Sequence, residues 1–324
     1  MKGPLFSGLV ALVAASLSHS AHAQRRPPGA SDRPMDESWP VTRSWDSAAE
    51  AEFGRWVQTI GRAVEARRCR TLASCLDSPA INPLYVSGRP STFRADCGDV
   101  PYILRAYFAW RRQLPFLHTA SVRGERASRD GRYSYTNRPA STRRWSDYAT
   151  PRRLLHDIGS SVHSGFFRMR PELDDSDTYP VCVDRGAIHP GTAFYDPDGH
   201  VLTVYEVRPD GEIRLIDGHP GGSFTARRFS SQLTLGSSRQ GGGFRNFRPM
   251  LLRRGAVTRP RNAELADYDA MVQHDPSRWV VRGRQLGYHD WVRVRLGAPL
   301  PPGAPPATTS AVAAASAPTV SPGR

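Results

Sequence analysis

Two turn signals that share the sequence Pro-Asp-Gly constrain the fold of this chain most strongly. They end at Gly199 and Gly211. The residues between them, 200–207, have the alternating pattern of a strand with one buried face. Shorter strand patterns occupy 193–195 and 213–217. Because short turns of this kind join antiparallel neighbours, the pattern predicts a β-hairpin within an antiparallel sheet.

Helical patterns come before these strands. Ser47 and Glu50 form a capping box that predicts the start of a first helix, and apolar residues then recur at three- and four-residue steps. A second helix is predicted to begin at Asp96 or Asp99, and a third to cover 151–162. The order indicates an α+β fold, in which N-terminal helices pack on an antiparallel β-sheet.

Less regular segments fill the remainder of the chain. Further strands are predicted at 247–252 and 279–281, while 268–272 and 289–296 look more helical than extended. Residues 123–150 are polar and arginine-rich, and they give no readable pattern.

The ends of the chain have compositions unlike its centre. A basic start, an apolar run at 5–17 and the exit Ala21-His22-Ala23 are typical of a secretory signal peptide over 1–23. Residues 24–38 are predicted to be a flexible lead-in, 39–297 one domain, and 298–324 a disordered Pro/Ala-rich tail. The apolar run is too short to cross a bilayer. We therefore expect a periplasmic or secreted protein without a stable membrane anchor.

The formal net charge is +14, and Lys2 is the only lysine, so nearly all the positive charge comes from arginine. Such a field favours acidic substrates or polyanionic partners. The chain has no zinc-finger spacing, no helix-turn-helix signature and no basic motif interleaved with aromatic residues. Composition therefore does not indicate a nucleic-acid partner.

The four cysteines carry structural and chemical information, because export permits disulfides. Cys69 and Cys75 lie six residues apart and are predicted to pair. Cys97 and Cys182 then either form a second bridge or remain free. Four cysteines allow three connectivities, and the sequence does not choose among them.

Cys97 is the candidate nucleophile, because it lies in the turn Asp96-Cys97-Gly98-Asp99 at a helix start. Unpaired N–H groups and the helix dipole favour a thiolate there, and the backbone N–H of Cys97 is a candidate oxyanion donor. Asp96 and Asp99 oppose the thiolate if they lie close to it, or else they cap the helix.

His200 is the candidate general base and Asp217 the group that orients it. If Leu202 pairs with Asp217, the period of two residues places His200 and Asp217 on one face of the hairpin, as diagonal neighbours. A loop of three residues would put Asp217 on the opposite face. His219 shares the predicted face and is the second choice as orienting residue.

The turn Asp96-Cys97-Gly98-Asp99, the segment 191–201 and the strand that ends at Asp217 resemble the papain-like superfamily, and within it the bacterial transglutaminase-like proteins and NlpC-type cell-wall peptidases. The resemblance covers 96–219 and implies a papain-like core with Cys97, His200 and Asp217 as a triad that cleaves or exchanges amide bonds. The long arginine-rich insert departs from the family. No upstream glutamine offers a second oxyanion donor, and Tyr85 or Asn82 are the alternates.

The expected substrate is a peptide or peptidoglycan-like stem peptide, whose carboxylates suit a basic protein, and no cofactor is expected. One alternative is a non-catalytic envelope protein of the same fold, which binds an anionic polymer or a protein partner and bridges Cys97 to Cys182. A metal hydrolase is a further alternative, although no compact ligand spacing supports it. The absence of a Gly-x-Ser-x-Gly elbow disfavours a serine hydrolase. The sequence leaves the oligomeric state open.

Overall fold

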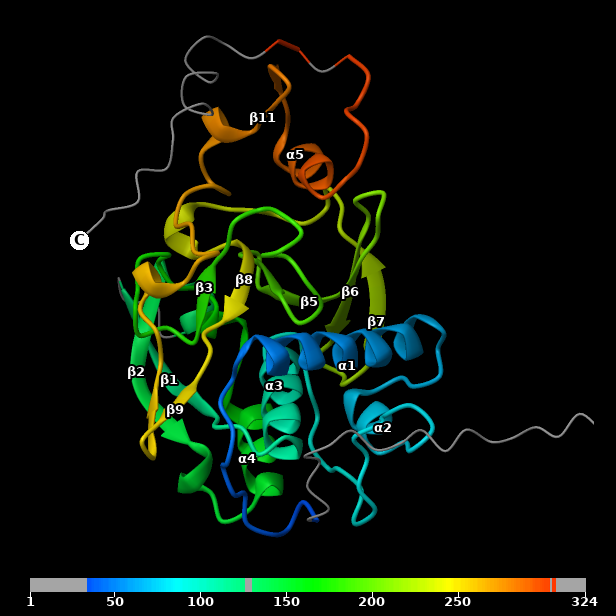
Figure 1. The fold of residues 1–324 in the computed structure, drawn as a ribbon, viewed down its shortest axis with the longest axis vertical. Helices are drawn as coiled ribbons and strands as arrows, with labels where there is room; N and C mark the ends of the chain where they lie inside the picture. The colour runs from blue at the N-terminus through cyan, green and yellow to red at the C-terminus, as the bar shows by residue number, and fades with distance from the viewer. Residues whose placement is uncertain (1–33, 126–129, 304, 307–324) are drawn as a thin grey trace, which may run out of the picture.

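The structure is a computed structural model that describes residues 34–125, 130–303, 305 and 306. The predicted signal peptide, most of the lead-in and residues 307–324 of the predicted tail lie outside the described residues. The described part is a mixed α/β protein built on an antiparallel sheet of six strands (Figure 1).

The strands of the central sheet follow one another in space in the order β3 (Thr178–Pro180), β8 (Gly243–Phe247), β4 (Ala193–Asp196), β5 (His200–Val207), β6 (Ile213–Gly218) and β7 (Phe224–Arg228). Three two-stranded sheets pair β1 (Leu117–Glu125) with β2 (Thr136–Arg144), β9 (Leu251–Arg253) with β10 (Ala256–Thr258), and β11 (Val280–Val281) with β12 (Arg284–Gln285). The sequence segment without a readable pattern thus folds mainly as the β1–β2 hairpin.

The helices are α1 (Ser47–Glu65), α2 (Leu72–Leu76), α3 (Val100–Arg111), α4 (Pro151–Ser161) and α5 (Tyr288–Arg295). Figure 1 shows α1 lying across α3 and near β7, while α5 lies at the far end of the molecule. Alternating residues of the sheet enter two cores. Tyr195, Val201 and Ile216 pack with α1, α3 and α4, whereas Phe194 and Leu202 pack with α5.

The pairing of β5 with β6 determines which residues face one another at the candidate site. The sequence predicts a loop of two or four residues in which Val207 pairs with Glu212, but Val207 pairs with Ile213, so the loop has an odd number of residues. A β-bulge between Val204 and Glu206 absorbs the extra residue, and Thr203 then pairs with Ile216. Continuing this register brings Leu202 opposite Asp217. The expectation about Leu202 and Asp217 therefore holds, although the expected loop pairing was wrong.

The bulged residue, Tyr205, packs directly against α1. A Cβ added to Gly61 would lie 2.2 Å from Cγ of Tyr205, so only glycine permits this approach. The buried face of α1 thus rests on the bulge that fixes the register of β5 and β6.

The cap of α1 differs from the predicted capping box. The N-cap is Asp46, whose carboxylate accepts a hydrogen bond from the N–H of Ala49 at 2.8 Å. Glu50 instead forms an ion pair with buried Arg105 on α3, which ties the two helices together. Aspartate is as good an N-cap residue as serine, so the sequence offers two neighbouring N-cap residues, and the structure uses Asp46 in place of Ser47.

The disulfide between Cys69 and Cys75 is present, as predicted, with an S–S distance of 2.07 Å. It closes the short connection that follows α1 and includes α2. The N–H of Phe224 donates to the carbonyl of Arg70 at 2.9 Å, which attaches this connection to the edge strand β7.

Two other segments differ from their expected structure. Residues 268–272 contain turns rather than a helix, because Asp269 accepts hydrogen bonds from the N–H groups of Met271 and Val272. The ordered chain also continues past 298. Leu300 packs against the core on the α5 side, and the N–H of Gln285 donates to the carbonyl of Pro305 at 3.0 Å.

Replacing Gly61 with alanine tests the contact between α1 and the bulge. Alanine favours a helix intrinsically, but here its methyl group would overlap Tyr205. We expect Gly61→Ala to lower the free energy of unfolding by about 1–3 kcal/mol in urea denaturation. Thr59→Ala on the exposed face of α1 is the control, with a change within about 0.5 kcal/mol. A Gly61→Ala variant as stable as its parent would show that Tyr205 moves away freely.

Candidate functional site

Cys97 lies where the chain turns into α3. The N–H of Val100 donates to the carbonyl of Asp96 at 3.2 Å, so helical hydrogen bonding begins before α3 itself. Asp99 is the N-cap residue, and Pro101 falls in the first turn, where its missing N–H costs least. Cys97 therefore precedes the N-terminus of a twelve-residue helix. The helix dipole there favours a negative charge on sulfur.

The thiol of Cys97 contacts the start of β5. Its Sγ lies 3.6 Å from the carbonyl oxygen of Gly199, the last residue of the first Pro-Asp-Gly turn. The side chain is 9% exposed. Among the described residues no acceptor takes the backbone N–H of Cys97, which leaves it available to a bound oxyanion.

His200 and Asp217 are hydrogen-bonded, with Nε2 of the histidine 2.8 Å from Oδ2 of the aspartate. This contact joins the start of β5 to the end of β6. Because Nε2 is used by Asp217, Nδ1 is the ring nitrogen left for Cys97. The Asp217 side chain is 1% exposed and that of His200 is 26% exposed, so the pair has one buried end and one accessible end.

A second chain of hydrogen bonds holds Asp217 from the other side. The hydroxyl of Thr225 donates to Oδ1 of Asp217, and Nε2 of His219 lies 2.9 Å from the same hydroxyl oxygen. Since the single hydroxyl proton goes to Asp217, Nε2 of His219 is the donor to Thr225. His219 thus supports the aspartate and stacks beside His200, with ring centres 6.0 Å apart.

These contacts change the acid–base properties of His200 and Asp217. The hydrogen bond to Asp217, followed by one to the Cys97 side chain, raises the pKa of His200 to about 9. Burial alone would raise the pKa of Asp217, but hydrogen bonds from His200 and Thr225 outweigh it, and the pKa falls below its usual 3.8. At neutral pH the pair is therefore an imidazolium next to a carboxylate, with the cysteine on the other side of the ring.

The two carboxyls beside Cys97 have different states. Burial, helped by the charge of Asp96, raises the pKa of Asp99 to about 9, so Asp99 is neutral at pH 7. Asp96 accepts a hydrogen bond from the N–H of Gly98 at 2.9 Å and closes the turn. Only one of the two acids therefore carries a charge that opposes a thiolate.

Glycines allow neighbouring segments to approach the nucleophile turn. A Cβ on Gly98 would lie 2.4 Å from the backbone of His163, and a Cβ on Gly218 would lie 2.7 Å from the carbonyl oxygen of Asp96. The turn is thus held between the residues after α4 and the end of β6. The turn can take this position only because Gly98 and Gly218 have no Cβ that would overlap the neighbouring backbone.

The alternate oxyanion residues lie elsewhere. Asn82 is buried and donates to the carbonyl of Leu76 and the hydroxyl of Tyr107, while its oxygen accepts from Trp56. Its amide is thus committed to the core. Among the described residues, Tyr85 makes no contact with the triad that would support a role as donor. Cys97 and Cys182 are separate thiols, and they belong to different cores.

Sequence reasoning missed Thr225 and Arg227 on β7. Nη1 of Arg227 lies 3.6 Å from Oδ2 of Asp217, so the edge strand supplies a cation as well as a hydroxyl to the aspartate. A hollow of about 510 Å³ continues from Thr225 along β7 and is bordered by Arg67 and Arg70. The glycine pair before β7 signals a second hairpin turn, and recognising it would have placed these residues beside Asp217.

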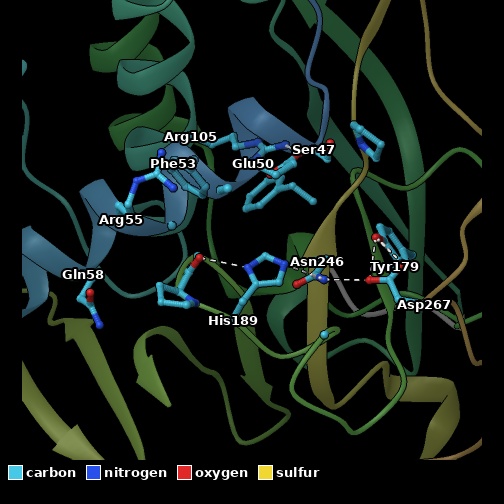
Figure 2. A pocket seen from close by; sticks show the side chains of 17 residues that line it. Ser47, Glu50, Phe53, Arg55, Gln58, Arg105, Tyr179, His189, Asn246 and Asp267 are labelled. Atoms are coloured by element: carbon cyan, nitrogen blue, oxygen red, sulfur yellow. Dashed lines mark hydrogen bonds and ion pairs between the residues drawn. The ribbon is translucent and has the colours of Figure 1, made fainter. Parts of the chain in front are cut away.

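A second hollow, of about 490 Å³, contains none of the triad residues. It lies between the first half of α1 and the loop 186–191 (Figure 2). Gly191 precedes β4 at one end of that strand, whereas Asp196 at its other end pairs with His200. The two sites therefore lie beyond opposite ends of β4.

Among the described residues, no group of three or more His, Cys, Asp or Glu side chains is arranged so that it could hold a metal ion. The helices described there include none that is both long and apolar enough to cross a bilayer. No protein-family model, curated protein or solved structure matches the chain.

Replacing Asp217 with asparagine tests the electrostatic link to His200. A histidine whose pKa rises on folding stabilises the protein below pH 6.5 and loses that contribution as pH rises toward 9. We expect Asp217→Asn to lower the pKa of His200 by at least one unit in an NMR titration. Thr225→Val, which keeps the carboxylate, should lower it less. An unchanged pKa of His200 in Asp217→Asn would contradict the hydrogen bond between His200 and Asp217.

Asp99→Asn tests the neutral carboxyl beneath the nucleophile turn. An acid whose pKa is raised on folding stabilises the folded state at low pH, and this contribution is lost as pH rises from 3.8 toward 9. The variant should therefore be more stable than the parent at pH 8, by at least about 1 kcal/mol, and nearly equal at pH 4. Urea denaturation at the two pH values measures this difference. Equal effects at both values would show that Asp99 does not titrate in this way.

Proposed function

We propose that this protein is an exported amide hydrolase or acyltransferase with a cysteine nucleophile, and that its core is papain-like. The observation that carries the proposal is the hydrogen-bonded pair of His200 and buried Asp217, with the Cys97 thiol next to the same histidine. A nucleophile, a base and an orienting acid within mutual reach are what covalent catalysis by cysteine requires. The disulfide is compatible with an oxidising compartment.

Each residue has one role in the proposed reaction. The Cys97 thiolate attacks an amide carbonyl and forms the C–S bond, while the backbone N–H of Cys97 donates to the oxyanion. The His200 imidazolium gives its proton to the leaving amine as the C–N bond breaks. Neutral His200 then takes a proton from water or from an acceptor amine, which attacks the thioester and releases Cys97. Asp217 keeps the ring oriented and stabilises its charged form.

Stem peptides of peptidoglycan are the proposed substrate. Their carboxylates suit the positive charge of the chain, and Arg67, Arg70 and Arg227 place such charge on the side of the triad formed by β7. A non-catalytic role with Cys97 bridged to Cys182 is less well supported, because the two cysteines are separate thiols.

Alkylation of Cys97 tests the proposal. We expect iodoacetamide at pH 6 to label Cys97 at least tenfold faster than Cys182, because burial raises the pKa of the Cys182 thiol. The advantage should disappear in His200→Ala, while the rate at Cys182 in the same molecule serves as the reference. Mass spectrometry of tryptic peptides locates the label. Equal labelling of Cys97 in the parent and in His200→Ala would remove the support for an activated nucleophile.

A further inference from the structure

The hollow between α1 and the loop 186–191 is a pocket with its own polar wall. Phe53 and Phe247 supply aromatic surface, and Pro190 closes the space against the helix. A Cβ on Gly191 would lie 2.6 Å from the ring of Phe53, so the loop reaches the helix only because this residue is glycine. Pockets with apolar walls and a few convergent polar groups are typical binding sites for small molecules.

The polar wall centres on Asn246, which is 6% exposed. Its amide nitrogen donates to the carbonyl of Ala187 at 2.9 Å and to Oδ2 of Asp267 at 3.0 Å, and it lies 3.4 Å from Nε2 of His189. Nδ1 of His189 is 3.1 Å from the carbonyl of Pro190. Nδ1 of His189 is thus the donor to that carbonyl, while Nε2 faces the Asn246 amide, both of whose hydrogens are used by Ala187 and Asp267. Figure 2 shows the ring of His189 pointing into the pocket.

Asp267 is the unbalanced charge in this wall. It accepts from the hydroxyl of Tyr179, at 2.9 and 3.1 Å, and from Asn246, both of which are neutral donors. No arginine or histidine nitrogen of the described residues comes within 4.0 Å of it. The other acid in the pocket, Glu50, is already neutralised by Arg105. The other cation that lines the pocket, Arg55, lies across it from Asp267 (Figure 2).

We infer that this pocket binds an organic cation, an amine attached to a compact apolar group, whose ammonium pairs with Asp267. Its apolar body would lie against Phe53 and Phe247. The site is independent of the proposed triad, because neither Cys97, His200 nor Asp217 lines it.

Three probes of the same shape and different charge test this inference: phenethylamine, 2-phenylethanol and phenylacetate. Saturable chemical-shift changes in the NMR spectrum of the mature protein measure their affinities. Phenethylamine should bind at least tenfold more tightly than the neutral alcohol, and phenylacetate more weakly than either. No saturable binding of phenethylamine up to 10 mM, or equal affinities for amine and alcohol, would overturn the inference.

Variants locate the site. Asp267→Asn should weaken binding of phenethylamine at least tenfold, whereas Asp269→Asn, which lies outside the pocket, should not. Ala51→Leu adds bulk to the pocket wall from an exposed position of α1, without changing any charge. It should also weaken binding, even if Asp267→Asn folds poorly. Unchanged affinity in Ala51→Leu would place the amine elsewhere. The alkylation rate of Cys97 should be the same with and without phenethylamine.

Discussion

The candidate site depends on the register between β5 and β6. Five residues separate the paired ends, Val207 and Ile213, and an odd loop would normally send Asp217 to the face opposite His200. The bulge at Tyr205 reverses that effect, and Gly61 on α1 lets the helix pack on the bulge. A backbone irregularity several residues away therefore decides whether the hydrogen bond between His200 and Asp217 can form.

Burial and hydrogen bonding then give the side chains of Asp217, Asp99 and His200 different charges. Asp217 is buried, yet hydrogen bonds keep its pKa low, whereas Asp99 is buried with little compensation and its pKa rises to about 9. His200 lies between Asp217 and Cys97, and both of them favour its protonated form. The two aspartates differ because donors surround one of them, while Oδ1 of the other has no partner among the described residues. Because Asp99 stays neutral beside the nucleophile turn, it does not counteract the stabilisation of a Cys97 thiolate by the dipole of α3.

Local patterns predicted the α+β class, the span of β5 and the disulfide, because each depends on neighbours in sequence. The bulge was not predictable from turn signals, since it depends on packing between Tyr205 and Gly61. Thr225 and Arg227 were missed because β7 is short and partly exposed, which gives a weak alternating pattern. Asn82 was chosen for its chemistry, but its amide is used inside the core, a long-range fact that sequence spacing does not contain.

The proposed chemistry is tested most directly by looking for the acyl-enzyme. The mature protein is incubated with purified stem peptides, quenched in acid within seconds, and digested for mass spectrometry. A thioester on Cys97 with the mass of the acyl half of the peptide, and release of the matching amine by the parent but not by Cys97→Ser, is the predicted result. Release of the amine by Cys97→Ser at the parental rate would contradict the assignment of Cys97 as nucleophile.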